Sequence, residues 1–381
     1  MIKICHIISD TNIGGAGILL LNLLSGLDRR RFSVSVILPR GSLLKKRLLS
    51  LSGVTVYEAK IAGDKSFSLS AILPLRRILK EISPDVVHTH ASLSGRIAAR
   101  LLPIPRVFVT RHSAWEEKGK HGQFRRLVFS LLSRLFGDLY IATADAARRD
   151  LSAIGVPSDR TVTVRNGSPE KIRISESEAR LWREKFSIPR DTFVVTVTAR
   201  LSREKGIDTL LRAAKRLLEA DGAYRFLIVG DGSEKKALLS LAKQYGIAEK
   251  VIFTGFVQDT AAALSVSHAV VSASRGTETS SLAISEAMSL GIPVVASDFG
   301  GNTEMVRDGE SGLLFPVDNA ARLAECIERL KKNEGLYKRL SKGARARYER
   351  EFTLSRMVHT YETLYTLSIP KVIGGVTAKN E

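Results

Sequence analysis

The chain of 381 residues has only two cysteines, Cys5 and Cys326, and each lies inside an apolar segment. Two isolated cysteines argue against a disulfide framework or a thiolate metal site, so we expect a reducing, cytoplasmic compartment. The sequence also lacks a run of about twenty apolar residues, which argues against a transmembrane helix. The first residues, MIKICHIISD, have no charged segment ahead of a long apolar stretch, and they predict a strand rather than a signal peptide.

Aromatic residues make up only 6% of the chain, whereas basic residues are abundant. Lys and Arg number 58 against 39 Asp and Glu, which gives a formal net charge of +19. Residues 1–170 alone hold 26 basic and 13 acidic side chains, so most of the excess lies in the N-terminal half. Such a charge attracts nucleic acid, anionic lipid or a phosphorylated ligand. Because no basic stretch is interleaved with aromatic residues, nucleic-acid binding is an alternative that we do not expect.

Short apolar segments rich in β-branched residues alternate with helix-length segments along the whole chain. The pattern runs once, stops at a polar segment over 166–191, and then restarts. Two such runs predict an α/β fold with two doubly wound, Rossmann-like domains facing across a cleft, and ligands at the carboxyl ends of strands. The expected strands are 2–8, 33–38, 85–88, 106–110, 139–143, 193–198, 225–229, 251–254, 269–273 and 293–296.

The polar joint sets the expected domain boundaries. We assign residues 1–170 to an N-terminal domain, 171–190 to a linker with a helical stretch, and 191–350 to a C-terminal domain. One helix is expected over 339–366, and we expect residues 351–368 to pack back on the N-terminal domain. The last residues, 369–381, are expected to be disordered.

The segment 276–297, GTETSSLAISEAMSLGIPVVAS, places Glu278 and Glu286 eight positions apart with small hydroxyl residues between them. Glu278 follows an expected strand, and a helix is expected to start at Ser280 or Ser281, where backbone amides and the helix dipole favour an anion. Glu286 comes about one and a half turns later, where a carboxylate suits the two hydroxyls of a ribose. The segment therefore predicts recognition of a sugar, a phosphate and a ribose, in that order.

A second basic segment, TARLSREKG over 198–206, follows another expected strand. Arg200 and Lys205 lie at its tip, and Gly206 opens a tight turn. Two cations in this position could neutralise a diphosphate, although surface charges in a loop would look the same. Their place after a buried strand of the same domain favours the binding site.

These residues carry a resemblance that spans nearly the whole chain. The chain resembles the retaining glycosyltransferases of the GT-B fold, in the large family four of nucleotide-sugar-dependent enzymes. The most specific element is the pair Glu278 and Glu286 followed by EAMSLGIPVVAS. The supporting segments are ARLSREKG, LIVGDGSEK, FTGFV and GGNTEMVRDGESGLLF, with IGGAG, DVVHTH and VTRH in the N-terminal half.

The resemblance implies a role for several donor-binding residues. Arg200 and Lys205 would hold the donor diphosphate, helped by backbone amides near Ser281 and Leu282. Glu286 would accept hydrogen bonds from the ribose, and the donor would be a nucleotide-sugar, a UDP-sugar being favoured.

The resemblance also implies which residues surround the transferred sugar and the base. Glu278 would contact the sugar near the reacting carbon, and Val257 would meet the base through its main chain. His112 would lie across the cleft beside the donor sugar. Gly14 and Gly15 would let the first loop approach donor and acceptor closely, because glycine has no side chain.

One departure from the family pattern concerns the residues after Glu278. Family members usually have a triplet like Gly-Phe-Gly there, whereas this chain has Thr279-Ser280-Ser281. The pose and identity of the donor sugar therefore transfer less directly. We expect the anion site of the helix start to survive, because serine is a good N-cap.

The chain contains no Asp-x-Asp motif, which many glycosyltransferases use to hold a divalent metal. Arg200, Lys205 and the helix N-terminus would then stabilise the leaving diphosphate, so we expect no metal cofactor. The resemblance favours attack on the same face of the sugar, with the departing phosphate taking the proton of the acceptor hydroxyl. Whether Glu278 is a nucleophile or a positioning group stays open.

The histidines at the strand ends need a separate interpretation. His88 and His90 alternate along one strand, but no third ligand of suitable spacing follows them, so a metal pair receives little weight. His6, inside the first strand, is expected to be a core residue. Only His112 has a functional interpretation, because of its place in the family pattern.

The segment 121–136, HGQFRRLVFSLLSRLF, has an amphipathic pattern. Phe124, Leu127, Val128, Leu131 and Leu135 share one helical face, and we expect that face to pack on the sheet of its own domain. The alternative is an interfacial helix on anionic lipid, because basic residues surround it. A basic acceptor domain without a membrane span suits a glycan or lipid-linked acceptor at the inner face of the plasma membrane, in lipopolysaccharide or polysaccharide synthesis.

Two other enzyme classes share this fold pattern. Gly15 and Gly17 provide the first two glycines of a dinucleotide fingerprint, but Leu20 replaces the third, and no acid ends the next strand. This argues against an oxidoreductase. A sugar-nucleotide epimerase or hydrolase of the same architecture stays an alternative.

Overall fold

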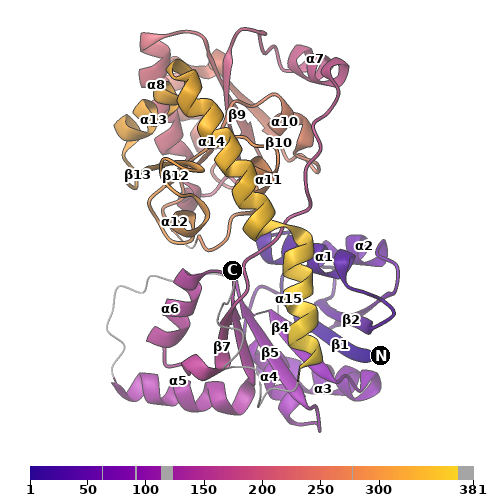
Figure 1. Ribbon diagram of the computed structural model, residues 1–381. Coiled ribbons are helices and arrows are strands. Elements are labelled where there is room, and N and C mark those ends of the chain that lie inside the picture. Colours follow the sequence, from indigo (N-terminus) through magenta and orange to yellow (C-terminus); the bar gives the residue numbers. More distant parts are fainter. Residues whose placement is uncertain (62, 91, 113–122, 277, 368–381) are drawn as a thin grey trace. The chain divides into compact units, whose positions relative to one another are not determined.

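The computed structural model describes residues 1–61, 63–90, 92–112, 123–276 and 278–367, with the backbone alone at 123–126. The chain forms two compact units, each drawn with its own sheet in Figure 1. The first unit consists of Met1–Gly167 and the segment from Leu354 onward, and the second is Ser168–Thr353. The tail that we expect to be disordered, 369–381, lies outside the described residues.

The first unit is built on a seven-stranded parallel sheet in the order β3-β2-β1-β4-β5-β6-β7. Helices α1–α6 follow the strands, as crossovers between parallel strands require. The strands are β1 (Ile2–Ile8), β2 (Phe32–Pro39), β3 (Val54–Ala59), β4 (Val86–His90), β5 (Arg106–Arg111), β6 (Leu139–Ala142) and β7 (Thr161–Thr163). The helices are α1 (Gly15–Gly26), α2 (Leu44–Leu49), α3 (Leu69–Ile82), α4 (Leu93–Arg100), α5 (Gln123–Phe136), α6 (Asp145–Ala153) and α15 (Leu354–Thr366).

The second unit has a six-stranded parallel sheet in the order β10-β9-β8-β11-β12-β13. Its strands are β8 (Phe193–Thr198), β9 (Tyr224–Val229), β10 (Val251–Gly255), β11 (Ala269–Ser272), β12 (Val294–Ser297) and β13 (Gly312–Phe315). Its helices are α7 (Glu176–Lys185), α8 (Ile207–Ala220), α9 (Lys235–Gln244), α10 (Ala261–Ser265), α11 (Leu282–Ser289), α12 (Asn302–Met305), α13 (Ala320–Lys332) and α14 (Glu334–Arg347). The predicted α/β class with two parallel sheets is confirmed.

All ten predicted strands are present, and three strands were missed. The missed strands are β3, β7 and β13. β3 lies at the edge of its sheet, and its sequence VTVYEA mixes polar with apolar residues. β7 has only three residues, and β13, GLLF, contains no β-branched residue, so neither shows the composition that marks the other strands.

The predicted linker over 171–190 belongs to the second unit. It contains α7, whose start is fixed by a capping box between Ser175 and Glu178. Trp182 and Phe186 from this segment pack against the core of the second unit beside Ile188. The segment is therefore part of a packed domain rather than a free joint.

The single helix predicted over 339–366 is interrupted. A π-helical turn over Tyr348–Phe352 ends α14, and Thr353 takes an extended backbone before α15 begins. α15 belongs to the first unit, where Tyr361 and Tyr365 are fully buried in the core beside the β1 side chains. The interruption occurs at the residue where the chain passes from one unit to the other.

Helix α5 differs from the expected packing. Leu127, Leu131 and Leu135 are 68%, 58% and 53% exposed, so the described part of the predicted apolar face does not pack on the sheet. Within the described chain, no helix is both long enough and apolar enough to cross a membrane.

Candidate functional site

The loops after β8 and β11 lie side by side, because these two strands are neighbours in the second sheet. This arrangement brings Lys205 to Glu278: the Nζ atom of Lys205 donates to Oε2 of Glu278 at 2.7 Å. The hydroxyl of Ser274 donates to the same oxygen at 2.7 Å. Glu278 is only 6% exposed, so these contacts stabilise a carboxylate that is largely removed from water.

Gly206 holds the first of these loops against the second. Its backbone is left-handed, with φ of 61°. A Cβ atom here would lie 2.0 Å from the carbonyl oxygen of Ala273, so only glycine fits without a shift of the loop. Since Lys205 directly precedes Gly206, this close approach places its ammonium group beside Glu278.

Arg200 lies just beyond the tip of β8 and is exposed. Within the described part of the chain, its side chain forms no hydrogen bond and no ion pair. The Oγ1 atom of Thr198, at the end of the same strand, is buried and has no hydrogen-bond partner among the described residues. The strand tip therefore offers one unengaged cation and one unengaged hydroxyl.

Helix α11 begins as expected, with Ser281 at its N-cap. The expected serine cap is wrong, however, because the Ser281 side chain makes no capping hydrogen bond. The backbone N–H of Ser281 points instead to Sδ of Met305 at 3.1 Å. The amides of the first turn, at Leu282 and after it, are thus not occupied by their own cap.

The residues before α11 are braced by Gly300 and Gly301. The Gly301 amide donates to the carbonyl oxygen of Glu278 at 3.0 Å. A Cβ at Gly301 would lie 1.4 Å from the Thr279 carbonyl oxygen. In the sequence, the GGNTE segment stands out only through the resemblance, and the structure shows that its glycines position the Glu278 loop.

Glu286 has different partners from Glu278. Its Oε2 atom accepts a hydrogen bond from the Thr260 hydroxyl at 2.7 Å, and its Oε1 atom lies 3.6 Å from Nζ of Lys171. The two carboxylates belong to one continuous segment, β11 to α11, but among the described residues they share no hydrogen-bond or ion-pair partner. Val257 follows β10 and is half-buried against the core of the unit.

A cavity of about 590 Å³ also lies in the second unit, and Lys171, Arg173 and Arg345 are among its lining residues. Both of its arginines are already in use: Arg173 donates to the Leu290 carbonyl oxygen at 2.9 Å, and Arg345 forms an ion pair with Glu170 at 2.6 Å. None of the residues predicted to bind the donor lines this cavity. We therefore assign it no part in the candidate site.

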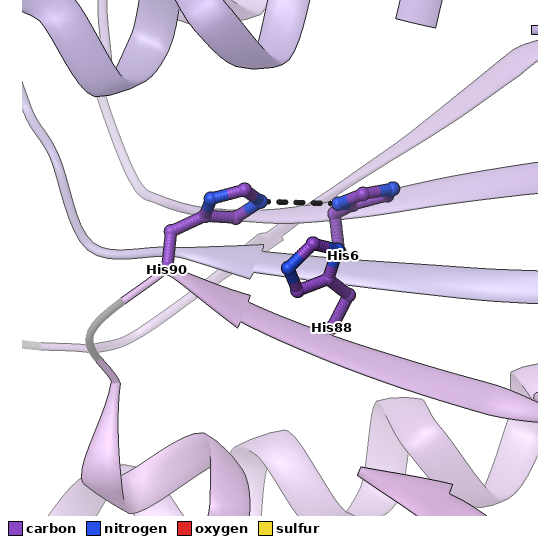
Figure 2. A group of neighbouring side chains, drawn as sticks. All are labelled: His6, His88 and His90. Atoms are coloured by element: carbon purple, nitrogen blue, oxygen red, sulfur yellow. Dashed lines mark hydrogen bonds between the residues drawn. The ribbon is translucent and has the colours of Figure 1, made fainter. Parts of the chain in front are cut away.

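In the first unit, the predicted residue His112 follows β5 and belongs to a chain of hydrogen-bonded imidazoles. Nδ1 of His90 lies 2.8 Å from Nε2 of His112, and Nε2 of His90 lies 3.1 Å from Nδ1 of His6. Figure 2 shows the second of these contacts, with the ring of His88 beside them. His88 bonds elsewhere, to the hydroxyls of Tyr365 at 2.8 Å and Thr110 at 2.6 Å.

Burial keeps these histidines neutral. It lowers the pKa of His112 to about 4 and that of His6 to about 3, the latter with help from the charge of Arg29. Burial also holds the pKa of His88 and His90 well below the ordinary value. His6 is fully buried, as predicted for a core residue.

No third ligand follows His88 and His90 at a suitable spacing in the sequence, but the fold brings His6 beside them. His6 pairs with His88 across the parallel strands β1 and β4, and ring nitrogens of His6, His88 and His90 lie within 4.8 Å of one another. Spacing along the chain could not reveal this group, because His6 is 82 residues before His88. These three rings could hold a metal ion, although neither a carboxylate nor a thiolate joins them among the described residues.

Gly14 and Gly15 connect β1 to α1. Gly14 is the N-cap of α1 in an extended conformation. A Cβ atom at Gly15 would meet no described atom within 4 Å, so the space above this loop is open. With His112, these glycines belong to the first unit, whereas the remaining predicted site residues belong to the second.

Comparison with known families identifies the chain. Residues 13–169 match the model for glycosyltransferase family 4, and residues 178–347 match the model for glycosyl transferases group 1. The chain is a family 4 glycosyltransferase. Activity of this class belongs to the EC 2.4 transferases, and the GT-B fold expected from the resemblance is confirmed by its structural relatives.

Three relatives cover most of this glycosyltransferase. A lipopolysaccharide core biosynthesis glycosyltransferase, LpsD of Rhizobium meliloti, is 26% identical over 374 residues, 97% of this chain and 99% of that protein. The phosphatidyl-myo-inositol mannosyltransferase of Mycobacterium leprae is 28% identical over 314 residues, 79% of each chain. The crystal structure of HepE from Anabaena, in complex with UDP and glucose, has a TM-score of 0.83 at 23% identity and covers 96% of this chain and 100% of that one.

The position of Gly206 generates a testable prediction. We expect Gly206→Ala to lower the free energy of unfolding by at least about 2 kcal/mol, because alanine meets both a left-handed backbone and the Ala273 carbonyl. Gly222→Ala is the matched control, since a Cβ there meets no described atom. Urea unfolding of both variants measures the difference, and equal losses would contradict the close approach.

Proposed function

We propose that this glycosyltransferase is a retaining enzyme that moves a hexose from a nucleotide-sugar, with a UDP-sugar favoured, to a glycan or lipid-linked acceptor in cell-envelope polysaccharide or lipopolysaccharide synthesis. The observation that carries the proposal is the buried Glu278, held by Ser274 and by Lys205, which lies on the same loop as Arg200. The LpsD relative supports the envelope role, and the complex of HepE with UDP and glucose supports the donor.

The proposed chemistry begins with charge on the leaving group. The ammonium of Lys205 has three N–H donors, and Glu278 uses one, so two remain for a diphosphate together with the guanidinium of Arg200. The first-turn amides of α11 from Leu282 onward add donors without a competing side-chain cap, whereas the Ser281 amide faces Sδ of Met305. Fixed donors of this kind stabilise negative charge as it develops in the transition state.

The bond changes are those of a same-face substitution. The bond between the anomeric carbon and the phosphate oxygen breaks, and a bond from that carbon to the acceptor oxygen forms on the same face. The acceptor hydroxyl gives its proton to an oxygen of the departing phosphate. Glu278 lies beside the reacting carbon and stabilises its positive charge, and Glu286 exchanges its contact with Thr260 for the ribose hydroxyls.

The remaining residues complete the site in this proposal. Val257 contacts the base through its main chain, and His112 contacts the donor sugar. Gly14 and Gly15 leave room for donor and acceptor at the loop after β1. The first unit binds the acceptor.

We expect substitutions of the two glutamates to affect different quantities, the rate for Glu278 and donor binding for Glu286. Glu278→Gln should lower the rate of UDP release from UDP-glucose by about a hundredfold and leave its Kd within about threefold, because the carboxylate acts mainly in the transition state. Glu286→Ala should weaken binding by about tenfold with little change in kcat, because one charged hydrogen-bond acceptor is lost. Isothermal titration beside steady-state kinetics measures both, and the reverse pattern would refute the roles.

We propose that the reaction needs no metal, because Arg200, Lys205 and the start of α11 supply the positive potential. UDP release should therefore persist in EDTA at a rate close to the untreated enzyme. Loss of activity in EDTA that Mg²⁺ or Mn²⁺ restores would contradict the proposed metal independence. Arg200→Ala should reduce the rate at least tenfold under both conditions, which shows that the assay reports on the site.

We also propose that α5 places the first unit on an anionic membrane surface, at the inner face of the plasma membrane of a cytoplasmic enzyme. Leu127, Leu131 and Leu135 repeat every four residues, so they form one exposed stripe. Basic side chains surround its end: Arg100 donates to the Leu135 carbonyl oxygen at 3.0 Å, and Arg160 donates to that of Arg134. An apolar stripe edged by cations suits the interface of a bilayer with anionic head groups.

Flotation with vesicles of phosphatidylcholine, with and without phosphatidylglycerol, tests this surface. The protein should float with anionic vesicles, and less at high salt. The double variant Leu127→Glu/Leu131→Glu should lower the partition coefficient by about a hundredfold, because each buried leucine contributes about 1.5 kcal/mol. Leu181→Glu, at an exposed leucine of α7, should leave it unchanged. Equal flotation of all three proteins would rule out α5 as the contact.

A further inference from the structure

Three imidazoles of the first unit are linked nitrogen to nitrogen. His112 contacts His90 at 2.8 Å, and the other nitrogen of His90 contacts His6 at 3.1 Å. The far nitrogen of His6, Nε2, is buried and has no hydrogen-bond partner among the described residues. These groups therefore form a chain with one end in the core and the other at the predicted site residue.

A link between two ring nitrogens needs one N–H and one lone pair. Because each ring is neutral and carries one proton, the two links must run in the same direction, and the tautomers of all three rings are coupled. Only two arrangements remain: the proton of His6 lies on Nε2 and points into the core, or it lies on Nδ1 and points to His90.

The buried Nε2 atom of His6 distinguishes between these two arrangements. A buried N–H without an acceptor is rarer in proteins than an oxygen or nitrogen lone pair without a donor. His6 therefore carries its proton on Nδ1 and donates to Nε2 of His90, and Nδ1 of His90 donates to Nε2 of His112.

We propose that His6 and His90 are positioning residues that hold His112 as the neutral tautomer with its proton on Nδ1. With Nε2 occupied as an acceptor and Nδ1 protonated, His112 has no ring lone pair left and cannot act as a general base. An N–H group suits an oxygen of the donor, such as a sugar hydroxyl or a phosphate. Only this last consequence rests on the proposed function.

A metal ion explains the cluster less well. Both nitrogens of His88 and of His90 already have hydrogen-bond partners, so coordination by the three rings would break several of these bonds. The site would also bury a doubly charged ion among neutral ligands, with no carboxylate among the described residues to balance it.

Nuclear magnetic resonance shows in which direction the hydrogen bonds run along His6, His90 and His112. Long-range ¹H–¹⁵N correlation spectra of protein labelled at its seven histidines separate protonated from bare ring nitrogens, and single substitutions assign the signals. We expect a protonated Nδ1 and a bare Nε2 for His112 in the wild type. A proton on Nε2 of His112 in the wild type would overturn the proposal. So would stoichiometric zinc in the wild type that is lost in His6→Phe.

Two substitutions test the coupling. His90→Phe should release His112 into a mixture of both tautomers. His88→Phe is the matched control, because His88 is buried in the same strand but bonds to Tyr365 and Thr110 instead. An unchanged spectrum of His112 in His90→Phe, or an equal change in both variants, would contradict the assigned coupling.

Activity provides a separate measurement. His90→Phe and His112→Phe should each slow UDP release from UDP-glucose by about tenfold or more, and the double variant should lose no more than the worse single one, because the two residues act as a unit. Additive losses would count against the positioning role. If the spectra show the expected tautomers but His112→Phe keeps the full rate, the assignment of the tautomers stands and the proposed contact of His112 with the donor sugar is wrong.

Discussion

The contact between Lys205 and Glu278 is the constraint on which the candidate site depends. A carboxylate that is largely removed from water is costly unless a cation or hydrogen-bond donors compensate it. The compensation is available only because β8 and β11 are neighbours in the sheet and Gly206 lets one loop press on the other. The same contact fixes the position of the Lys205 ammonium group beside Glu278. The Arg200 side chain has no hydrogen bond or ion pair among the described residues.

The parts of the site that the sequence predicted are those fixed by position along a strand. Buried parallel strands have a recognisable composition, so the ends of β8 and β11 could be located, and with them Lys205 and Glu278. Side-chain direction could not be predicted, because it depends on neighbours in space. The spacing of Glu278 and Glu286 therefore did not reveal that one bonds Lys205 and the other Thr260. For the same reason the Ser281 hydroxyl, a good N-cap by composition, does not cap α11.

The fold was predictable where the periodic pattern was long and failed where a local break or a distant partner decides. A three-residue strand such as β7, or one without β-branched residues such as β13, lacks the composition that marks the others. The turn at Tyr348–Phe352 interrupts a helix whose sequence looks continuous. His6 is the clearest case of a distant partner. It joins His88 and His90 only because β1 pairs with β4, a pairing set by the order of strands in the sheet.

The two units differ in the electrostatics of their predicted site residues. The second unit offers the cationic side chains of Arg200 and Lys205. The first offers neutral imidazoles, because burial lowers the pKa of His112 to about 4. The unfolded chain therefore binds protons more readily than the folded one. The contribution of His112 to the free energy of unfolding is complete above the ordinary histidine pKa of about 6.5 and falls as the pH drops below it. A histidine kept neutral in this way can donate a hydrogen bond without adding charge, so in the proposed reaction the leaving diphosphate would be stabilised by the cations of the second unit.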